Sequence, residues 1–376
     1  LHLYAPTFSP FSQAADAFLI GENEFRELLI PLQLGLNSLS EEVTIADNTF
    51  EMSEYGNAIT IPIMNPGRLH GRIGIVRNHF SGNGHYFADI SYESLLPSEL
   101  AIELAHNEVD CNTEASGCSA FRWQSINNSH ADHVFDFHIH DNRLVTTETG
   151  ILITDECSPP QGTGDWHTIN FHAHDNEVEV HGSGYGIALI PESMSNCTQA
   201  IDSHIHHNRV AFQSNSQPVS NGYGIFVYAR HNGPPMTKRT HIHDNTVSRM
   251  GYAMVLVTER QHIDNFDQTP QFHHTQVDNN LIIESYYGIY HVLQNAMQNS
   301  SFPLSHSQRI RGNTIDTLGN GVISTHYLYR YNAPPAPSAP STAIEDISDN
   351  VIEGAGGGEA ITMETYLMDQ TQTPMS

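Results

Sequence analysis

Histidines recur in pairs along the middle of the chain, with one aliphatic residue between the two members of each pair. The pairs are His138 and His140, His172 and His174, His204 and His206, and His241 and His243. Imidazole nitrogens with carboxylates nearby can hold Zn, Ni or Cu. Two other interpretations stay open: a polar ladder of neutral, stacked imidazoles, which we favour, and a pH-sensitive assembly face, because protonated histidines repel one another.

A second set of residues could carry out acid–base chemistry on a sugar. It consists of Glu156, Glu192, Arg230 and Arg260, which follow similar short strands in successive segments. If Glu156 and Glu192 are neighbours, their carboxyl groups would lie roughly 5–9 Å apart, a range that covers retaining and inverting glycoside hydrolysis. Elimination from a uronate is the competing chemistry, with an arginine as base and calcium as the neutralising cation. The plain alternative is that these side chains form weak surface ion pairs.

Aromatic residues accompany this charged set. Alignment of the short strands places two outward columns side by side, one through Leu256 and the other through Thr258, and the aromatic members of this face are Tyr185, Tyr223, Phe226, Tyr228, Tyr287 and Tyr290. An outward group of Tyr and Phe is unusual on a solvated face and is typical of surfaces that bind sugar rings or protein partners. We therefore expect these six residues to bind substrate.

All of these residues belong to a sequence repeat. An aliphatic residue, two variable residues, Asn, one variable residue and an apolar residue recur about every 25 to 37 positions. The asparagines are Asn23, Asn48, Asn78, Asn107, Asn142, Asn176, Asn208, Asn245, Asn280, Asn313 and Asn350. Each unit then continues with a glycine and an alternating apolar strand, as at Gly150, Gly186 and Gly224. A short unit of this kind cannot bury its apolar face alone, so the units must stack.

This pattern resembles the right-handed parallel β-helix of the pectate-lyase-like superfamily, over about residues 19–366. The resemblance implies an all-β solenoid of about eleven coils, with an internal ladder of asparagines that adopt the left-handed conformation in the turns. It also implies that a polysaccharide groove lies over the sheet built from the Gly-led strands. Residues 1–18 would cap the first coil, and residues 367–376 would form a tail.

Composition limits the partners. The chain has 15 Lys plus Arg against 42 Asp plus Glu, and Lys238 is its one lysine, so it has no cationic surface for nucleic acid or an anionic membrane. No apolar run approaches a membrane span of about 18 residues, which argues against membrane insertion. The four cysteines, Cys111, Cys118, Cys157 and Cys197, fit two loop-closing disulfides and an extracellular or periplasmic location. A homo-oligomer remains open.

Two functions are compatible with these features. The first is an exported β-helix that binds a polysaccharide or cell-surface glycan along the aromatic face and cleaves it with the charged set. The second is a non-enzymatic surface, adhesion or filament module, with metal capture by the histidine columns as one branch. We interpret His291, which occupies an inward position, as a satisfied core histidine.

Overall fold

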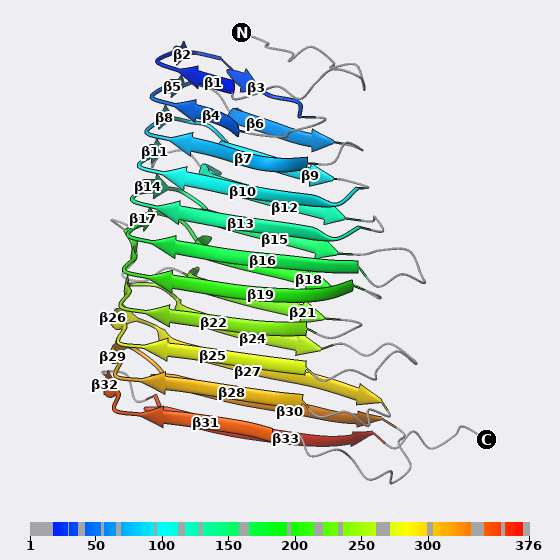
Figure 1. Cartoon of the computed structure of the whole chain (residues 1–376). Helices are drawn as coiled ribbons and strands as arrows, with labels where there is room; N and C mark the ends of the chain where they lie inside the picture. Colours follow the sequence, from blue (N-terminus) through cyan, green and yellow to red (C-terminus); the bar gives the residue numbers. More distant parts are fainter. Residues whose placement is uncertain are drawn as a thin grey trace, which may run out of the picture.

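Three parallel sheets make up the described part of the molecule. The computed structural model describes residues 18–28, 30–36, 42–53, 56–64, 69–93, 96–111, 117–127, 131–157, 165–193, 197–213, 221–231, 236–260, 271–298, 304–331, 342–354 and 358–370. Each sheet has eleven strands, and no helix occurs among these residues. The fold is an all-β parallel β-solenoid, as the repeat predicts (Figure 1).

Sheet A contains the strands that precede each repeat asparagine. They are β1 (Phe18–Gly21), β4 (Glu42–Ala46), β7 (Leu69–Val76), β10 (Ser98–Ala105), β13 (His133–His140), β16 (Asp165–His174), β19 (Cys197–His206), β22 (Met236–His243), β25 (Gln271–Asp278), β28 (Leu304–Arg311) and β31 (Thr342–Ser348).

Sheet B contains the short strands that follow the asparagines. They are β2 (Glu24–Arg26), β5 (Thr49–Met52), β8 (His79–Gly82), β11 (Glu108–Cys111), β14 (Arg143–Thr146), β17 (Glu177–Val180), β20 (Arg209–Phe212), β23 (Thr246–Ser248), β26 (Leu281–Ser285), β29 (Thr314–Thr317) and β32 (Val351–Gly354).

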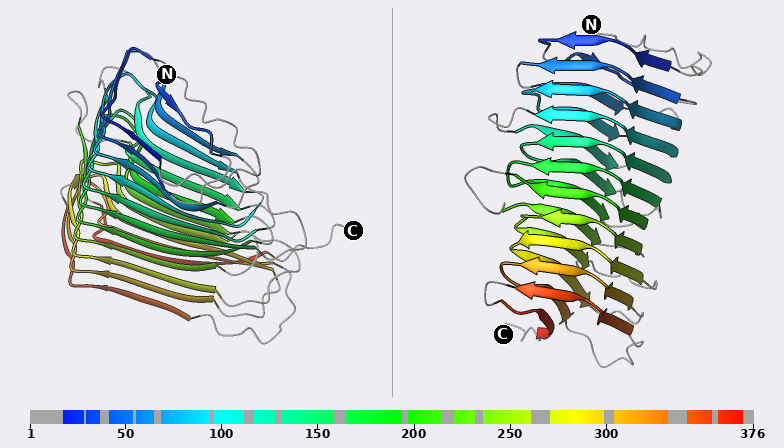
Figure 2. Two further views of the ribbon diagram at one scale, coloured as in Figure 1. Left: turned by 45° about the horizontal axis from the view of Figure 1, so that its top comes forward. Right: turned by 90° about the vertical axis from the view of Figure 1, so that its left-hand side faces the viewer.

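Sheet C contains the third strand of each unit. Its members are β3 (Leu32–Gln33), β6 (Asn57–Met64), β9 (Tyr86–Glu93), β12 (Ser119–Asn127), β15 (Ile151–Cys157), β18 (Tyr185–Ser193), β21 (Tyr223–His231), β24 (Tyr252–Arg260), β27 (Tyr287–Gln298), β30 (Val322–Tyr331) and β33 (Ile361–Gln370). The chain visits sheets A, B and C in turn, so each strand pairs with the third strand after it, and the solenoid rises steadily from one end to the other (Figure 2).

The repeat asparagines form the continuous ladder that the sequence predicts. From Asn23 to Asn350, the side-chain Nδ2 of each asparagine donates to Oδ1 of the next, over 2.9–3.1 Å. Nδ2 of Asn208, for example, also donates to the carbonyl oxygens of Ala173 and His206. The buried turn thereby satisfies its polar groups without water.

The predicted backbone conformation of these asparagines is wrong. The residue before the asparagine takes the left-handed conformation, with φ of 54° at Asp141 and Asp175 and 56° at His207. Asn142, Asn176 and Asn208 are not among the residues with positive φ. The asparagine side chain is committed to the ladder, so the chain reversal falls on its neighbour.

Close packing explains the glycine near the start of several strands of sheet C. A Cβ on Gly224 would lie 2.5 Å from the carbonyl oxygen of Ala253 and 2.5 Å from Cγ1 of Val247. Ala253, not Gly251, is the residue in the following strand that occupies this place, since Tyr223 pairs with Tyr252. The predicted outward positions of Leu256 and Thr258 are wrong. Leu256 pairs with Val227 and not with Phe226, and because a shift of one residue inverts the faces of a strand, both side chains are buried.

Both predicted domain boundaries lie close to the ends of the described solenoid. Strand β1 begins at Phe18, and residues 1–17 of the predicted cap lie outside the described residues. At the other end, β33 continues to Gln370, beyond the predicted boundary at 366.

Two disulfides connect neighbouring segments. Cys111 at the end of β11 pairs with Cys118, and Cys157 at the end of β15 pairs with Cys197 at the start of β19. No described cysteine is free. The two disulfides are compatible with an extracellular or periplasmic protein.

Candidate functional site

The charged row on the outer face of sheet C follows the strand register, with one change from the predicted set. Glu156 pairs with Glu192, Glu192 with Arg230, and Arg230 with Glu259. Arg260 instead pairs with His231, one position further along. The same one-residue difference in β24 that misplaced Leu256 puts the carboxylate of Glu259, and not an arginine, beside Arg230. Glu259 was absent from the predicted set.

Arg230 lies between carboxylates in this row. Its Nη1 lies 3.9 Å from Oε2 of Glu192, and the side chains of both residues are little more than a quarter exposed. Two residues before Arg230 on β21, the Tyr228 hydroxyl donates to Oε2 of Glu259 on the neighbouring strand β24. Burial, together with this hydrogen bond, holds the pKa of Tyr228 well above its ordinary value. The phenol therefore remains a hydrogen-bond donor at neutral pH.

The spacing of the carboxylates sets the chemistry that the row allows. Glu156 and Glu192 occupy facing positions on adjacent strands, about 4.8 Å apart at the backbone. Glu192 and Glu259 are two strands apart, or about 9.6 Å at the backbone. These separations bracket the values of about 5–5.5 Å for retaining and about 6.5–9.5 Å for inverting glycosidases. Lys238 is excluded as a base for this face, because its side chain is buried inside the solenoid.

A ladder of four tyrosines lies at the start of the same strands, seven residues or roughly 23 Å before the charged row. Tyr185, Tyr223, Tyr252 and Tyr287 stack in succession, with ring centroids separated by 5.3, 5.3 and 4.6 Å. Phe226 contacts the first two rings, at 5.1 and 5.0 Å. The stacked rings cover one another's faces, so they offer mainly their edges and hydroxyl groups to a ligand.

Tyr252 was absent from the predicted aromatic set because no glycine follows it. Each of the other three ladder tyrosines directly precedes a glycine, whereas Tyr252 precedes Ala253. Tyr290, which was predicted, lies 5.9 Å from the ring of Tyr252. The structure brings the six predicted aromatic residues and Tyr252 onto four successive strands of sheet C.

Sheet C carries another polar cluster nearer its N-terminal end, which sequence reasoning also missed. Arg122 donates two hydrogen bonds of 2.8 Å to the carboxylate of Asp89 and lies over the ring of Tyr86, 4.4 Å from its centroid. Asn57 donates to the same carboxylate over 3.0 Å. These residues belong to three different units, and no local motif connects them.

The histidines of sheet A form the two predicted columns. His138, His172, His204 and His241 pair in register, and so do His140, His174, His206 and His243. Ring centroids in the second column are 5.0, 5.0 and 4.9 Å apart, with interplanar angles of 3°, 4° and 9°. In the first column two contacts are parallel, at 6° and 2°, while His204 and His241 meet at 68°.

Column geometry favours packing over metal binding. The lone pairs of parallel imidazoles point in the same direction, whereas a bound metal needs lone pairs that converge on one point about 2.0–2.1 Å from each nitrogen. Nδ1 of His140, His174 and His243 is already 2.7–2.8 Å from the carboxylate of the next residue. The predicted metal role of the eight histidines remains a prediction.

The pKa values of several column histidines are lowered. Burial, followed by the neighbouring histidines, lowers the pKa of His206 to about 4 and also lowers the pKa values of His172 and His241. These imidazoles are therefore neutral at pH 7.

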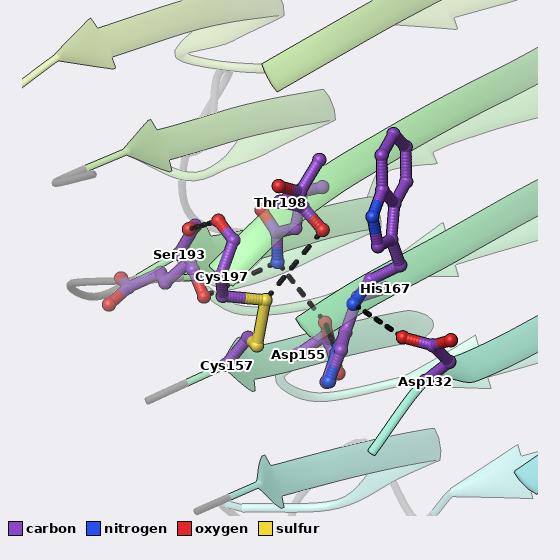
Figure 3. Close-up of a disulfide and its surroundings, with 10 residues drawn as sticks. Asp132, Asp155, Cys157, His167, Ser193, Cys197 and Thr198 are labelled. Atoms are coloured by element: carbon purple, nitrogen blue, oxygen red, sulfur yellow. Dashed lines mark hydrogen bonds and ion pairs between the residues drawn. A yellow bond between two sulfur atoms is a disulfide. The ribbon is translucent and has the colours of Figure 1, made fainter. Parts of the chain in front are cut away.

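Three groups of side chains in the described part of the chain have the geometry to hold a metal ion. The first, His106, His140 and Asp141, lies at the exposed edge of the columns. The second joins His167 to Cys157 and Cys197, but the disulfide removes both thiolates as ligands (Figure 3). The third is the buried group His291, His306 and His326.

His167 has a structural partner of its own. Its Nδ1 lies 3.2 Å from Oδ2 of Asp155, which also accepts a hydrogen bond from Gln199 (Figure 3). The pair lies beside the disulfide and is almost completely buried.

No family model, curated protein or solved structure matches the chain. Within the described residues, we find no helix with the length and apolar character needed to span a membrane.

Proposed function

We propose that the protein is an exported, right-handed parallel β-helix of about eleven coils, of the pectate-lyase-like type, which binds a neutral or weakly charged polysaccharide along the outer face of sheet C. The observation that carries this proposal is that strands of sheet C bear the tyrosine ladder at their start and the row of Glu192, Arg230 and Glu259 seven residues later, roughly 23 Å along the strand. Ring edges and phenols supply apolar contact and hydrogen bonds, and the charged row supplies directional partners for sugar hydroxyls.

Charge supports a neutral ligand. The chain carries a net charge of −27, which repels a polyanion, and the arginine in the row already lies beside a carboxylate. Cleavage by Glu156 and Glu192 is the enzymatic form of the proposal, since their facing positions on adjacent strands, about 4.8 Å apart at the backbone, allow the carboxyl separation of about 5–5.5 Å that a retaining hydrolase uses. Calcium would be required only for the less favoured reaction, elimination from a uronate.

A glycan-array screen with the full chain, followed by calorimetry with the hits, tests binding. Phe226→Ala should weaken binding by about tenfold or more through lost contact area. Phe272→Ala is the matched control, because Phe272 is an exposed aromatic residue on sheet A. Equal effects of the two substitutions would refute binding on sheet C. A reducing-end assay with Glu192→Gln then separates an enzyme from a binder.

One observation favours a second candidate, end-to-end assembly. Within the described residues, the final strands of the three sheets, β31, β32 and β33, each pair with one neighbour only. Ile344, Val351, Ile361 and Met363 are each roughly half exposed there. Open strand edges with apolar side chains are templates for pairing with another copy. Analytical ultracentrifugation should then show oligomers that Val351→Lys disperses, and a monomer at every concentration would refute assembly.

A further inference from the structure

Three histidines converge in the interior of the solenoid, at a place unrelated to the proposed glycan face. His291 of β27 and His326 of β30 point inward from sheet C, and His306 of β28 points inward from sheet A. Their side chains are 1%, 6% and 1% exposed, respectively. The group therefore connects two sheets across the core.

Distances within this group suit a common ligand. The ring centroid of His306 lies 5.3 Å from that of His291 and 5.6 Å from that of His326. One nitrogen from each of the three rings lies within 4.8 Å of the other two. Nitrogens about 2.0–2.1 Å from a tetrahedral Zn²⁺ are about 3.4 Å apart, so modest ring rotations would close the site. The rings of His291 and His306 are stacked at 24°, but the ring of His326 meets them at 73° and 90°, so its lone pair can converge with theirs.

Hydrogen bonding leaves the group incomplete. Among the described residues, Nε2 of His291 and both ring nitrogens of His306 are buried and have no hydrogen-bond partner. Buried polar atoms are nearly always paired, so each such atom calls for an explanation. A metal ion would accept the lone pair of one nitrogen from each ring.

A carboxylate and a hydroxyl group adjoin the three histidines. Nε2 of His326 forms an ion pair with Oε1 of Glu345, a side chain that is 14% exposed. The other nitrogen of His291, Nδ1, lies 3.4 Å from Oγ of Ser324. A hydrogen bond from the far nitrogen to an oxygen is the usual way in which a metal-bound imidazole is oriented.

We propose that His291, His306 and His326, with Glu345 as the fourth ligand, form a buried structural site for a divalent transition-metal ion, Zn²⁺ above all. Three imidazoles and one carboxylate are donors that Zn²⁺ accepts in tetrahedral geometry. The bound ion would cross-link sheets A and C in the last coils of the solenoid. This proposal is independent of the glycan proposal, because it uses none of the residues on the outer face of sheet C.

The experiment uses the full chain after removal of metals with a chelator. Titration with ZnCl₂ against a chromophoric competitor should show one tight site, and Co²⁺ should give the visible absorption of tetrahedral coordination. His306→Gln should weaken Zn²⁺ binding by about 100-fold or more, since even changes to outer-shell partners weaken metal sites by about 10- to 100-fold. Glu345→Gln, at the partly exposed edge of the site, should also weaken it and is the variant to use if His306→Gln does not fold.

His206→Gln is the matched control, because His206 belongs to the columns of sheet A and should leave the tight site unchanged. Absence of Zn²⁺ and Co²⁺ binding by the folded, stripped protein would overturn the proposal. So would a tight site that survives in both His306→Gln and Glu345→Gln but disappears in His206→Gln, since that result would place the metal on the columns.

Discussion

The hydroxyl of Tyr228 donates a hydrogen bond to Oε2 of Glu259 on the next strand of sheet C. Burial makes the largest contribution to the raised pKa of Tyr228, and this hydrogen bond raises the pKa further. We expect Tyr228 to remain protonated at a pH above about 10, where an unperturbed tyrosine ionises. In NMR spectra of protein with labelled tyrosines, the signal of Tyr228 is the one that should disappear in Tyr228→Phe. Glu259→Gln should bring its titration to lower pH, and an unchanged titration would contradict the role of Glu259.

The histidine columns should make the protein sensitive to acid. The pKa of His206 is about 4 in the folded chain and about 6.5 in the unfolded chain, so between these values the unfolded chain binds more protons. The free energy of unfolding should therefore fall as the pH falls from about 6.5 to 4. His172 and His241 shift in the same direction and add to the effect.

The test is the midpoint of thermal unfolding as a function of pH, in wild type and His206→Gln. Glutamine is a fitting replacement, because Gln276 already occupies the first column beside His241. We expect a shallower loss between pH 6.5 and 4 in the variant and similar behaviour of both proteins near pH 8. Parallel curves throughout would show that His206 does not titrate in this window.

Lys238 should destabilise the fold at neutral and acidic pH. Burial lowers its pKa from 10.5 to about 7, and its Nζ donates to Oγ1 of Thr258 over 3.0 Å. Between pH 7 and 10.5 the unfolded chain binds the proton that the folded chain lacks, so stability rises with pH in this window. Lys238→Met removes this dependence and should be more stable at pH 6 by up to about 4 kcal/mol.

Unfolding of both proteins with a chelator present, at pH 6 and at pH 10, measures this difference. The advantage of the variant should shrink at the higher pH. An advantage that does not change with pH would contradict a lowered pKa and point to packing alone.

Breaking the asparagine ladder in its middle should be more harmful than breaking it at its end. The Asn208 side chain donates to Ala173, His206 and Asn245, and it accepts from the backbone and side chain of Asn176. Asn208→Ala leaves several buried groups unpaired and should lower the free energy of unfolding by about 3 kcal/mol or more. Asn350→Ala, at the end of the ladder, is the control and should lower it by roughly half as much. Equal losses in denaturant unfolding would contradict the ladder as a buried network.

The longer disulfide should stabilise the fold more than the shorter one. Cys157 and Cys197 are 40 residues apart and Cys111 and Cys118 are 7 apart, so chain-entropy estimates give about 4 and about 2.5 kcal/mol. Thermal unfolding of the two paired Cys→Ser variants checks the order. A larger loss from Cys111→Ser/Cys118→Ser would show that chain entropy does not dominate.

Sheet A could be predicted in detail because its spacing to the asparagine never changes. In each of four units the two histidines stand four and two residues before the ladder residue, as in His140 and Asn142. The ladder places the asparagines over one another, so every residue at a constant offset is stacked as well. The histidine columns followed from this offset alone.

Sheet C could be predicted only in part, because segments of variable length separate it from the asparagine. The predicted alignment of β24 placed Arg260 beside Arg230, whereas the hydrogen-bond register places Glu259 there. The error of one residue inverted the strand and hid both Tyr252 and Glu259 from the prediction. Backbone pairing, which the sequence does not display, determines the composition of this face.

The amino-acid sequence alone was sufficient for the parallel solenoid, the asparagine ladder and the stacked histidines, since each depends on a repeat with constant spacing. Only the tertiary structure revealed that His291, interpreted as a satisfied core residue, meets His306 and His326 with unpaired nitrogens. These residues come from two sheets that face each other across the core. The repeat specifies what stacks along the axis, but the width and filling of the interior depend on every coil at once.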